Sequence, residues 1–117
     1  MSGWSVVERM KSAGFESPLL SEAVRFAELA ALARDRDPYE FMSCALSALS
    51  LFVYAAAQHQ RSEGLAWVSL PKNPVVVEIR RNSLPENMLG MFVDRIARYV
   101  EFEVRQIVGK LSRGQGV

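Results

Sequence analysis

Hydrophobic residues recur with a helical period over most of the chain, and three proline-containing signals divide this pattern into segments. Ser17-Pro18, Asp37-Pro38 and Ser83-Leu84-Pro85 each place a capping side chain before a proline, which is tolerated in the first turn of a helix. Glu40 and Glu86 follow the second and third caps at the spacing of a capping box. The sequence therefore predicts helices at residues 5–13, 18–34, 38–59 and 85–111.

The predicted helix over 38–59 is the least polar segment of the chain, with small residues nearly all round and large apolar residues between them. Because a helix that is apolar on most sides must be surrounded, we expect it to be the central helix, or one that also meets another subunit. Its uncharged part, 41–57, has 17 residues and three serines, which is at the short limit for a membrane span. A core helix is the better interpretation.

Residues 65–80 break the helical period. In 65–70 and again in 75–80 the apolar residues alternate with a period of two, and a Pro-Lys-Asn-Pro turn connects the two runs. We expect a β-hairpin that lies on a helix or pairs with another chain, because a lone hairpin is marginal in water. The predicted fold is mainly α, of the α+β kind: a single domain over 1–117, with about four helices and one β-hairpin before a long C-terminal helix.

The charge of the chain is nearly balanced but unevenly placed. The formal net charge of the 117 residues is +1, so no global field draws the protein to nucleic acid or membrane. Residues 80–117 carry seven basic and four acidic side chains, a local excess of +3, whereas residues 1–79 carry −2. A single cysteine excludes an intrachain disulfide, and the first residues lack the design of a signal peptide, so a cytoplasmic setting is expected.

Few residues have the chemistry of a catalytic site. Cys44 lies in the most apolar segment with no neighbouring histidine to activate it, and the one histidine, His59, stands near a predicted helix end. No cysteine–histidine cluster suits zinc, and no glycine-rich loop follows a strand. We therefore expect no enzyme activity, no catalytic residue, no cofactor and no metal.

Basic side chains in the last third of the chain are the main candidates for binding. Arginine can hold phosphate oxygens in a bidentate manner, and a row of arginines along a helix could follow a nucleic-acid backbone. The alternative is a solvated helix face on which Asp94 and Glu101 offset the arginines, with Glu101 and Arg105 as an i,i+4 ion pair. The candidate nucleic-acid contacts are Arg80, Arg81, Arg95, Arg98, Arg105 and Lys110.

Three aromatic residues are candidates for contact with other protein chains. Trp67 in the predicted hairpin is either an exposed aromatic beside the basic edge or a core residue, and both interpretations stay open. Tyr54 and Phe52, in the apolar helix, would meet a neighbouring subunit. The partners expected are other protein subunits, further copies of this chain, and RNA or DNA backbone, without a membrane.

The order of a helix pair, a hairpin built as LAWVSLPKNPVVVEI and a long last helix announced by NSLPEN resembles a known family. It is similar, over roughly residues 19–113, to the small subunit of archaeal type I-A CRISPR effector (Cascade) complexes. This resemblance implies a non-enzymatic protein of antiviral defence that assembles in several copies and contacts nucleic acid through a basic surface. The alternative is a small homo-oligomeric interaction protein, antitoxin-like or viral structural, without nucleic-acid binding.

Overall fold

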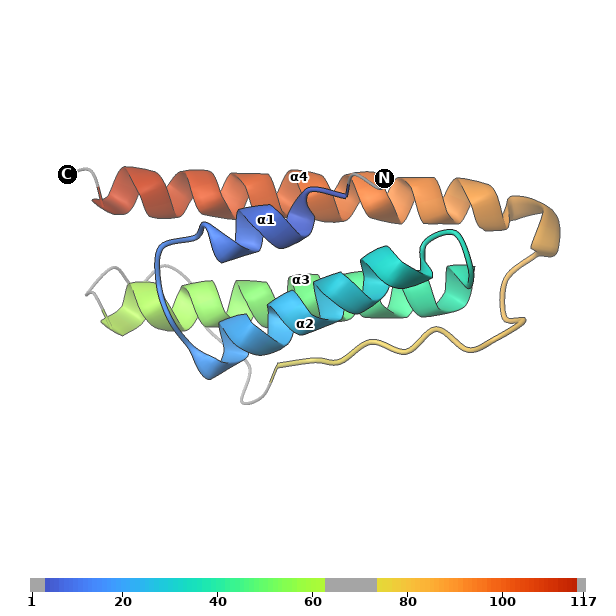
Figure 1. Ribbon diagram of the computed structural model, residues 1–117, viewed down its shortest axis with the longest axis horizontal. Helices are drawn as coiled ribbons and strands as arrows, with labels where there is room; N and C mark the ends of the chain where they lie inside the picture. Colours follow the sequence, from blue (N-terminus) through green and yellow to red (C-terminus); the bar gives the residue numbers. More distant parts are fainter. Residues whose placement is uncertain (1–3, 63–73, 116–117) are drawn as a thin grey trace.

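The computed structural model describes residues 4–62 and 74–115, and these residues form four α-helices and one short 3-10 helix (Figure 1). The predicted short first helix, the helix pair and the long last helix are all confirmed. The helices are α1 (Val6–Lys11), α2 (Pro18–Ala33), α3 (Pro38–Ser62), η1 (Glu86–Met88) and α4 (Leu89–Gln115).

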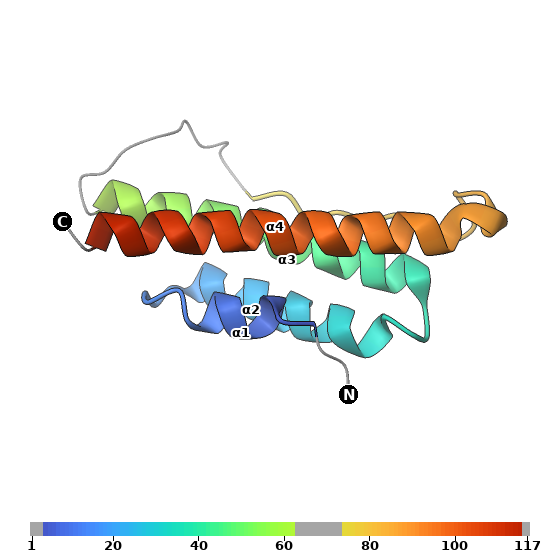
Figure 2. The ribbon, with the colours of Figure 1, turned by 90° about the horizontal axis from the view of Figure 1, so that it is seen from above.

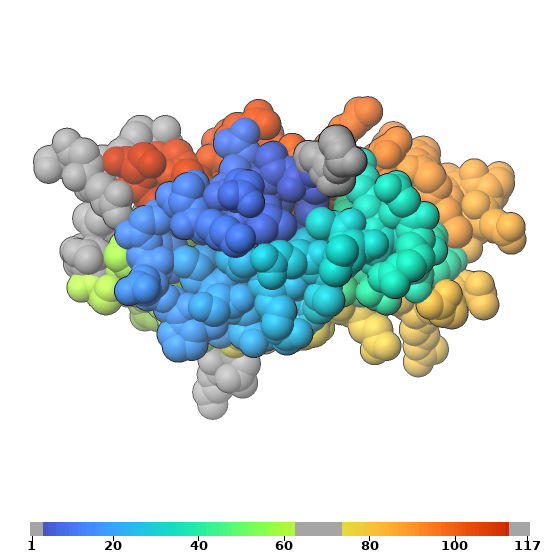
Figure 3. All heavy atoms as spheres, viewed as in Figure 1, coloured from blue at the N-terminus to red at the C-terminus, as the bar shows by residue number. Residues whose placement is uncertain are grey.

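The helices pack as an elongated bundle of about 47 × 32 × 21 Å. Helices α3 and α4 lie side by side along the long axis, and α1 and α2 form a second layer against them (Figures 1 and 2). Seen from the side of that second layer, α1 and α2 cover the middle of the molecule and α4 forms its upper rim (Figure 3). Helix α3 therefore lies at the centre, as the hydrophobic pattern predicts.

The core is built from large side chains of α3 and from rows of alanine. Phe41, Met42 and Phe52 are fully buried, and α2 contributes alanines such as Ala23 and Ala27 that are equally inaccessible. Small side chains let the axes of two helices approach closely, because interaxial distance depends on the residues at the contact. This explains why α2 and α3 make the most extensive contact in the bundle.

Two of the three predicted helix starts are confirmed by their hydrogen bonds. The Ser17 hydroxyl accepts a hydrogen bond from the Leu19 amide at 3.1 Å, and the Asp37 carboxylate accepts from the amides of Tyr39 and Glu40 at 3.1 and 3.2 Å. These bonds satisfy amides that have no partner inside the helix.

The third predicted start is wrong in detail. Ser83 makes no capping hydrogen bond in the described part of the chain, and its amide instead donates to the Arg80 carbonyl in a turn. The chain then passes through η1 and enters α4 at Leu89, four residues later than predicted. The capping box at Asp37 is also incomplete, because the Asp37 amide donates to the Ala33 carbonyl rather than to Glu40.

The predicted β-hairpin is wrong. Within residues 4–62 and 74–115 the chain forms no β-strand, and residues 74–80 are extended without a strand beside them. Their backbone bonds go to side chains of α3 instead, as described below. The run 65–70, with Trp67, lies outside the described residues. The mainly α class stands, but the β component does not.

Glycine substitutions offer a test of the helix assignments. Gly90 is exposed in the first turn of α4, and a Cβ added there would meet no atom within 4 Å. Alanine has less conformational entropy than glycine in the unfolded chain and therefore loses less of it on folding. Gly90→Ala is expected to raise the free energy of unfolding by about 0.5–1 kcal/mol, and urea denaturation measures this change.

The matched control is Gly14→Ala. Gly14 has a φ of 89°, a left-handed conformation that costs an L-residue roughly 1–2 kcal/mol, so this variant is expected to lose stability. If both variants changed stability in the same direction, the first turn of α4 or the turn after α1 would be wrongly assigned.

Candidate nucleic-acid interface

The connecting segment, residues 74–85, lies along α3 and is held there by side-chain hydroxyl groups. The Ser47 hydroxyl accepts a hydrogen bond from the Val77 amide at 2.8 Å and donates to the Val77 carbonyl at 3.1 Å. Four residues earlier on α3, the Ser43 hydroxyl accepts from the Ile79 amide at 2.9 Å. The two serines thus supply the backbone partners that a neighbouring strand would otherwise supply.

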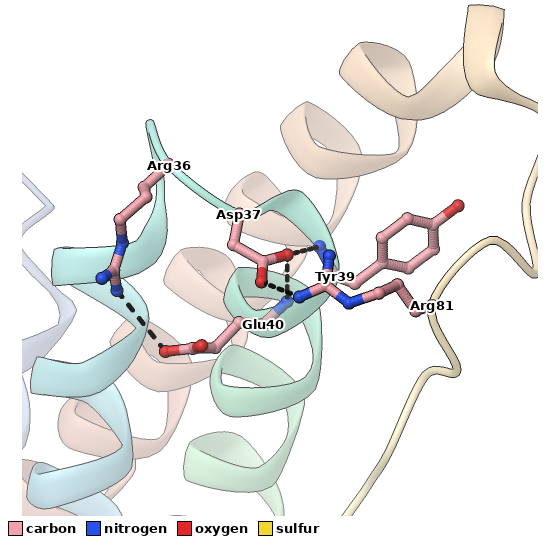
Figure 4. Close-up of polar contacts among 5 residues, drawn as sticks. All are labelled: Arg36, Asp37, Tyr39, Glu40 and Arg81. Atoms are coloured by element: carbon pink, nitrogen blue, oxygen red, sulfur yellow. Dashed lines mark hydrogen bonds and ion pairs between the residues drawn. The ribbon is translucent and has the colours of Figure 1, made fainter.

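The far end of the connecting segment is fixed in the same manner. The Tyr39 hydroxyl accepts from the Leu84 amide at 3.3 Å and donates to the Leu84 carbonyl at 3.2 Å. Beside it, the Arg81 guanidinium forms an ion pair with Asp37, the residue that caps α3 (Figure 4). Contacts to positions 47, 43 and 39 follow in order along the segment, so it runs antiparallel to α3.

This hydroxyl row was not recognised from the sequence. Tyr39, Ser43 and Ser47 are spaced four residues apart, which places them on one face of a helix. In an apolar helix such a row is a signal that this face needs polar partners, because a buried hydroxyl without a hydrogen bond is costly. From the pattern alone, the two serines look like small core residues of an apolar helix.

Asp37 has the most heavily engaged carboxylate in this region. Its pKa lies below the ordinary value, first because the Glu40 amide donates to the carboxylate and further because of the Arg81 guanidinium. The neighbouring Glu40 carboxylate faces Arg36 at 3.6 Å (Figure 4). Asp37 therefore joins three elements: the start of α3, the turn before it and the connecting segment.

The outward face of α4 carries arginines and aromatic residues together. Arg95, Arg98 and Arg105 are exposed, and each is far from the stripe that packs in the core. Tyr99 and Phe102 lie among them, and 53% of each is exposed. We call these five residues the α4 face. The three α4 arginines that the sequence predicts on one side of the helix are all exposed, and the aromatic residues between them in the sequence were missed.

The arginines of the α4 face form no ion pair with the part of the chain that the structure describes. Within the described residues, none of their three guanidinium groups has a carboxylate oxygen within 4.0 Å. The predicted pair between Glu101 and Arg105 is not formed. The three positive charges are thus available to an external anion.

The other predicted nucleic-acid contacts do not join the arginines of the α4 face. Arg81 is paired with Asp37, and Arg80 is exposed on the connecting segment, which lies along the opposite edge of α3 from α4 (Figure 1). Lys110 is exposed on α4 and follows Arg105 by five residues, which turns it about 140° from Arg105 and onto the side of the helix where Tyr99 lies. The six predicted residues therefore form at least two separate groups.

The residues predicted to contact other protein chains do not form one surface in the described part of the chain. Phe52 is 0% exposed, so its assignment to an interface is wrong: it fills the core between helices. Tyr54 is half-buried and lines a groove of about 350 Å³ together with other residues of α3, the connecting segment and Tyr99. Trp67 lies outside the described residues.

The candidate catalytic side chains occupy separate surroundings. Burial raises the pKa of the Cys44 thiol, which favours the unreactive protonated form. His59 stacks on Phe15 with ring centroids 4.6 Å apart. The described residues contain no group of three side chains that could hold a metal ion.

Comparison with protein-family models, with curated proteins and with solved structures found no match to this chain. Among the described helices, α3 is long and apolar enough to cross a membrane by length and composition alone. Most of this apolar stretch is buried by other parts of the bundle, which favours the core interpretation.

Removing one hydroxyl tests how the connecting segment is held. Ser47→Ala leaves both the amide and the carbonyl of Val77 without their partner, so we expect a loss of about 1–3 kcal/mol in the free energy of unfolding. Urea denaturation measures it. The matched control is Ser50→Ala, because Ser50 is a half-buried serine of the same helix and the hydrogen bonds to residues 77 and 79 come from Ser47 and Ser43 instead. Equal losses in both variants would show that the Ser47 hydroxyl does not hold the connecting segment on α3.

The lowered pKa of Asp37 predicts an acid-dependent stability. Because the folded-state pKa lies below the unfolded value, Asp37 stabilises the fold above its unfolded pKa, and this contribution disappears as the pH falls through the folded pKa. Asp37→Asn keeps a capping side chain but cannot titrate. Below about pH 4, wild-type stability is therefore expected to fall more steeply than that of Asp37→Asn.

Urea unfolding at a series of pH values measures the two slopes. The control is Glu86→Gln, which removes an exposed carboxylate that forms no ion pair in the described residues. Parallel slopes for wild type and Asp37→Asn would show that the Asp37 contacts do not contribute.

Proposed function

We propose that this chain is a non-catalytic subunit of a nucleoprotein assembly, in which the α4 face contacts a nucleic-acid backbone. The observation that carries the proposal is the combination, on one helix, of two half-exposed aromatic rings and three arginines that form no ion pair with residues 4–62 and 74–115. A solvated helix face of the ordinary kind would be expected to pair its arginines with the neighbouring Asp94 and Glu101.

The length of the α4 face suits several phosphates. Arg95 and Arg105 are ten residues apart, which corresponds to about 15 Å along a helix. One strand of a duplex carries a charge every ~3.4 Å of axis, so this distance spans about four phosphates. Guanidinium groups bind phosphate oxygens through paired hydrogen bonds, which supports contact with the backbone rather than with particular bases.

The aromatic residues favour a single strand. Tyr99 and Phe102 present open ring surface between the arginines, and unpaired bases can stack on such rings. Bases in a duplex are already stacked on each other and cannot do so. We therefore propose single-stranded RNA or DNA as the preferred ligand.

A second candidate function is protein binding without nucleic acid. Arginine, tyrosine and methionine are enriched at protein interfaces, and Met91 is exposed on the same side of α4. Membership of a CRISPR effector complex stays a prediction: the hairpin that carried the resemblance is not found in the described residues, so the proposal rests on the α4 face alone.

Titration of fluorescently labelled single strands and duplexes, followed by anisotropy at several salt concentrations, tests the proposal. We expect the single strand to bind more tightly and the affinity to fall steeply with salt. Replacing Arg95, Arg98 and Arg105 by alanine should reduce the slope of log affinity against log salt by about two to three. Replacing Tyr99 and Phe102 by alanine should weaken the single strand at least about tenfold and the duplex much less.

The control is the triple variant Arg25→Ala, Arg36→Ala and Arg61→Ala, which removes the same charge from other surfaces. If this variant lost as much affinity as the α4 variant, binding would follow net charge rather than the α4 face. Absence of binding at low salt would overturn the proposal and leave protein binding as the function of the α4 face.

A further inference from the structure

The connecting segment has a second backbone edge that faces away from α3. In an extended chain, the backbone groups of successive residues point to opposite sides. Since Val77 and Ile79 direct theirs to the serines of α3, those of Val76 and Glu78 point outward. These outward groups have no hydrogen-bond partner among the described residues, and both side chains are exposed.

An exposed extended edge of this kind is a template for a further strand. Its composition suits pairing, because the β-branched Val75 and Val76 are 57% and 61% exposed. The segment is also fixed on a helix before any partner arrives, so little further ordering is needed when a strand is added.

We propose that the connecting segment pairs with the same segment of a second copy of this chain, as a short antiparallel ladder. Glu78 would lie opposite the partner's Arg80, and Arg80 opposite the partner's Glu78. Each of these pairs would exchange both backbone hydrogen bonds. The Arg80 carbonyl already accepts from the Ser83 amide at 3.1 Å, and its second lone pair remains for the ladder.

The charges of Glu78 and Arg80 determine which partner and which register of pairing are favourable. A two-fold antiparallel pairing about Ile79 places Glu78 and Arg80 opposite each other twice, so two favourable cross-strand pairs form from one sequence. A shift that centred the pairing on Glu78 would oppose two carboxylates, which is destabilising. The edge is thus complementary to itself, whereas a strand of unrelated sequence would match it only by coincidence.

The length of the ladder sets its strength. Pro74 stands at one end and lacks an amide hydrogen, and the turn at Asn82, with a φ of 63°, stands at the other. Only a few residues can pair between them, so the association is expected to be reversible and to depend on concentration. The inference does not require the α4 face to bind nucleic acid, because it rests on different residues.

Sedimentation velocity of the full chain without nucleic acid, from low micromolar to about 1 mM, tests this inference. We expect a monomer–dimer equilibrium in the wild type. Glu78→Arg alone and Arg80→Glu alone should each weaken dimerisation at least about tenfold, because each opposes like charges twice. The double variant Glu78→Arg with Arg80→Glu should restore the wild-type affinity.

Mixing the two single variants gives a sharper result. One copy then carries two arginines and the other two glutamates, so the mixture should form a heterodimer although neither variant associates well alone. Glu86→Arg and Arg61→Glu are the matched controls, because they make the same charge changes at exposed sites off the segment. A chain that stays monomeric throughout, or a dimer that both reversals leave unchanged, would overturn the proposal.

Circular dichroism and urea denaturation of each variant separate loss of pairing from loss of folding. Both side chains are exposed and have no ion pair in the described residues, so the variants are expected to keep the wild-type midpoint. Because the dimer is measured without nucleic acid, its failure would leave the proposal for the α4 face unaffected.

Discussion

Helix α3 carries apolar residues on nearly every side, and the rest of the chain is arranged to keep them from water. Helix α2 covers one side with alanines, α4 covers another, and the connecting segment runs along a third (Figure 1). The free energies of apolar burial and of hydrogen bonding show that the two interactions have different roles in this fold. Burying one phenylalanine is worth roughly 1.5–3 kcal/mol, and a net hydrogen bond only about 1 kcal/mol. Apolar burial therefore supplies the stability, and the hydroxyls of α3 determine the path of the connecting segment.

The same packing determines what α4 can present to a partner. Val100, Val104 and Leu111 are held against the core, so the opposite side of this helix must face solvent. The arginines and aromatic rings of the α4 face occupy that side. Their joint exposure follows from the core stripe of α4, and no loop is needed to position them.

The helices could be predicted because their signals are local. A cap such as Ser17 acts on amides two or three residues away, and the apolar stripe of α4 is written into one continuous stretch. The hairpin failed because a period of two reports only that side chains alternate. It does not report which group accepts the backbone hydrogen bonds of Val77, and the answer lies 30 residues earlier, at Ser47.

For the candidate site residues too, features that depend on local sequence could be predicted, and features that depend on distant elements could not. The exposure of Arg95, Arg98 and Arg105 follows from their own helix and was predictable. The burial of Phe52 and the pairing of Arg81 with Asp37 depend on distant elements and were not.

Binding a strand to a helix, rather than to another strand, has a consequence for assembly. In a hairpin, each strand pairs the backbone groups of one edge with the other strand of the same chain. On α3, the serines occupy one edge of the connecting segment and leave the second edge without a partner in the described residues. In the view of Figure 1, α3 lies between the connecting segment and α4, and Tyr99 of α4 lines a groove with Pro74, Val75 and Val77 of the segment. Pairing through the edge uses none of Arg95, Arg98 and Arg105, so copies joined at the edge would each keep an arginine-rich helix open to a ligand.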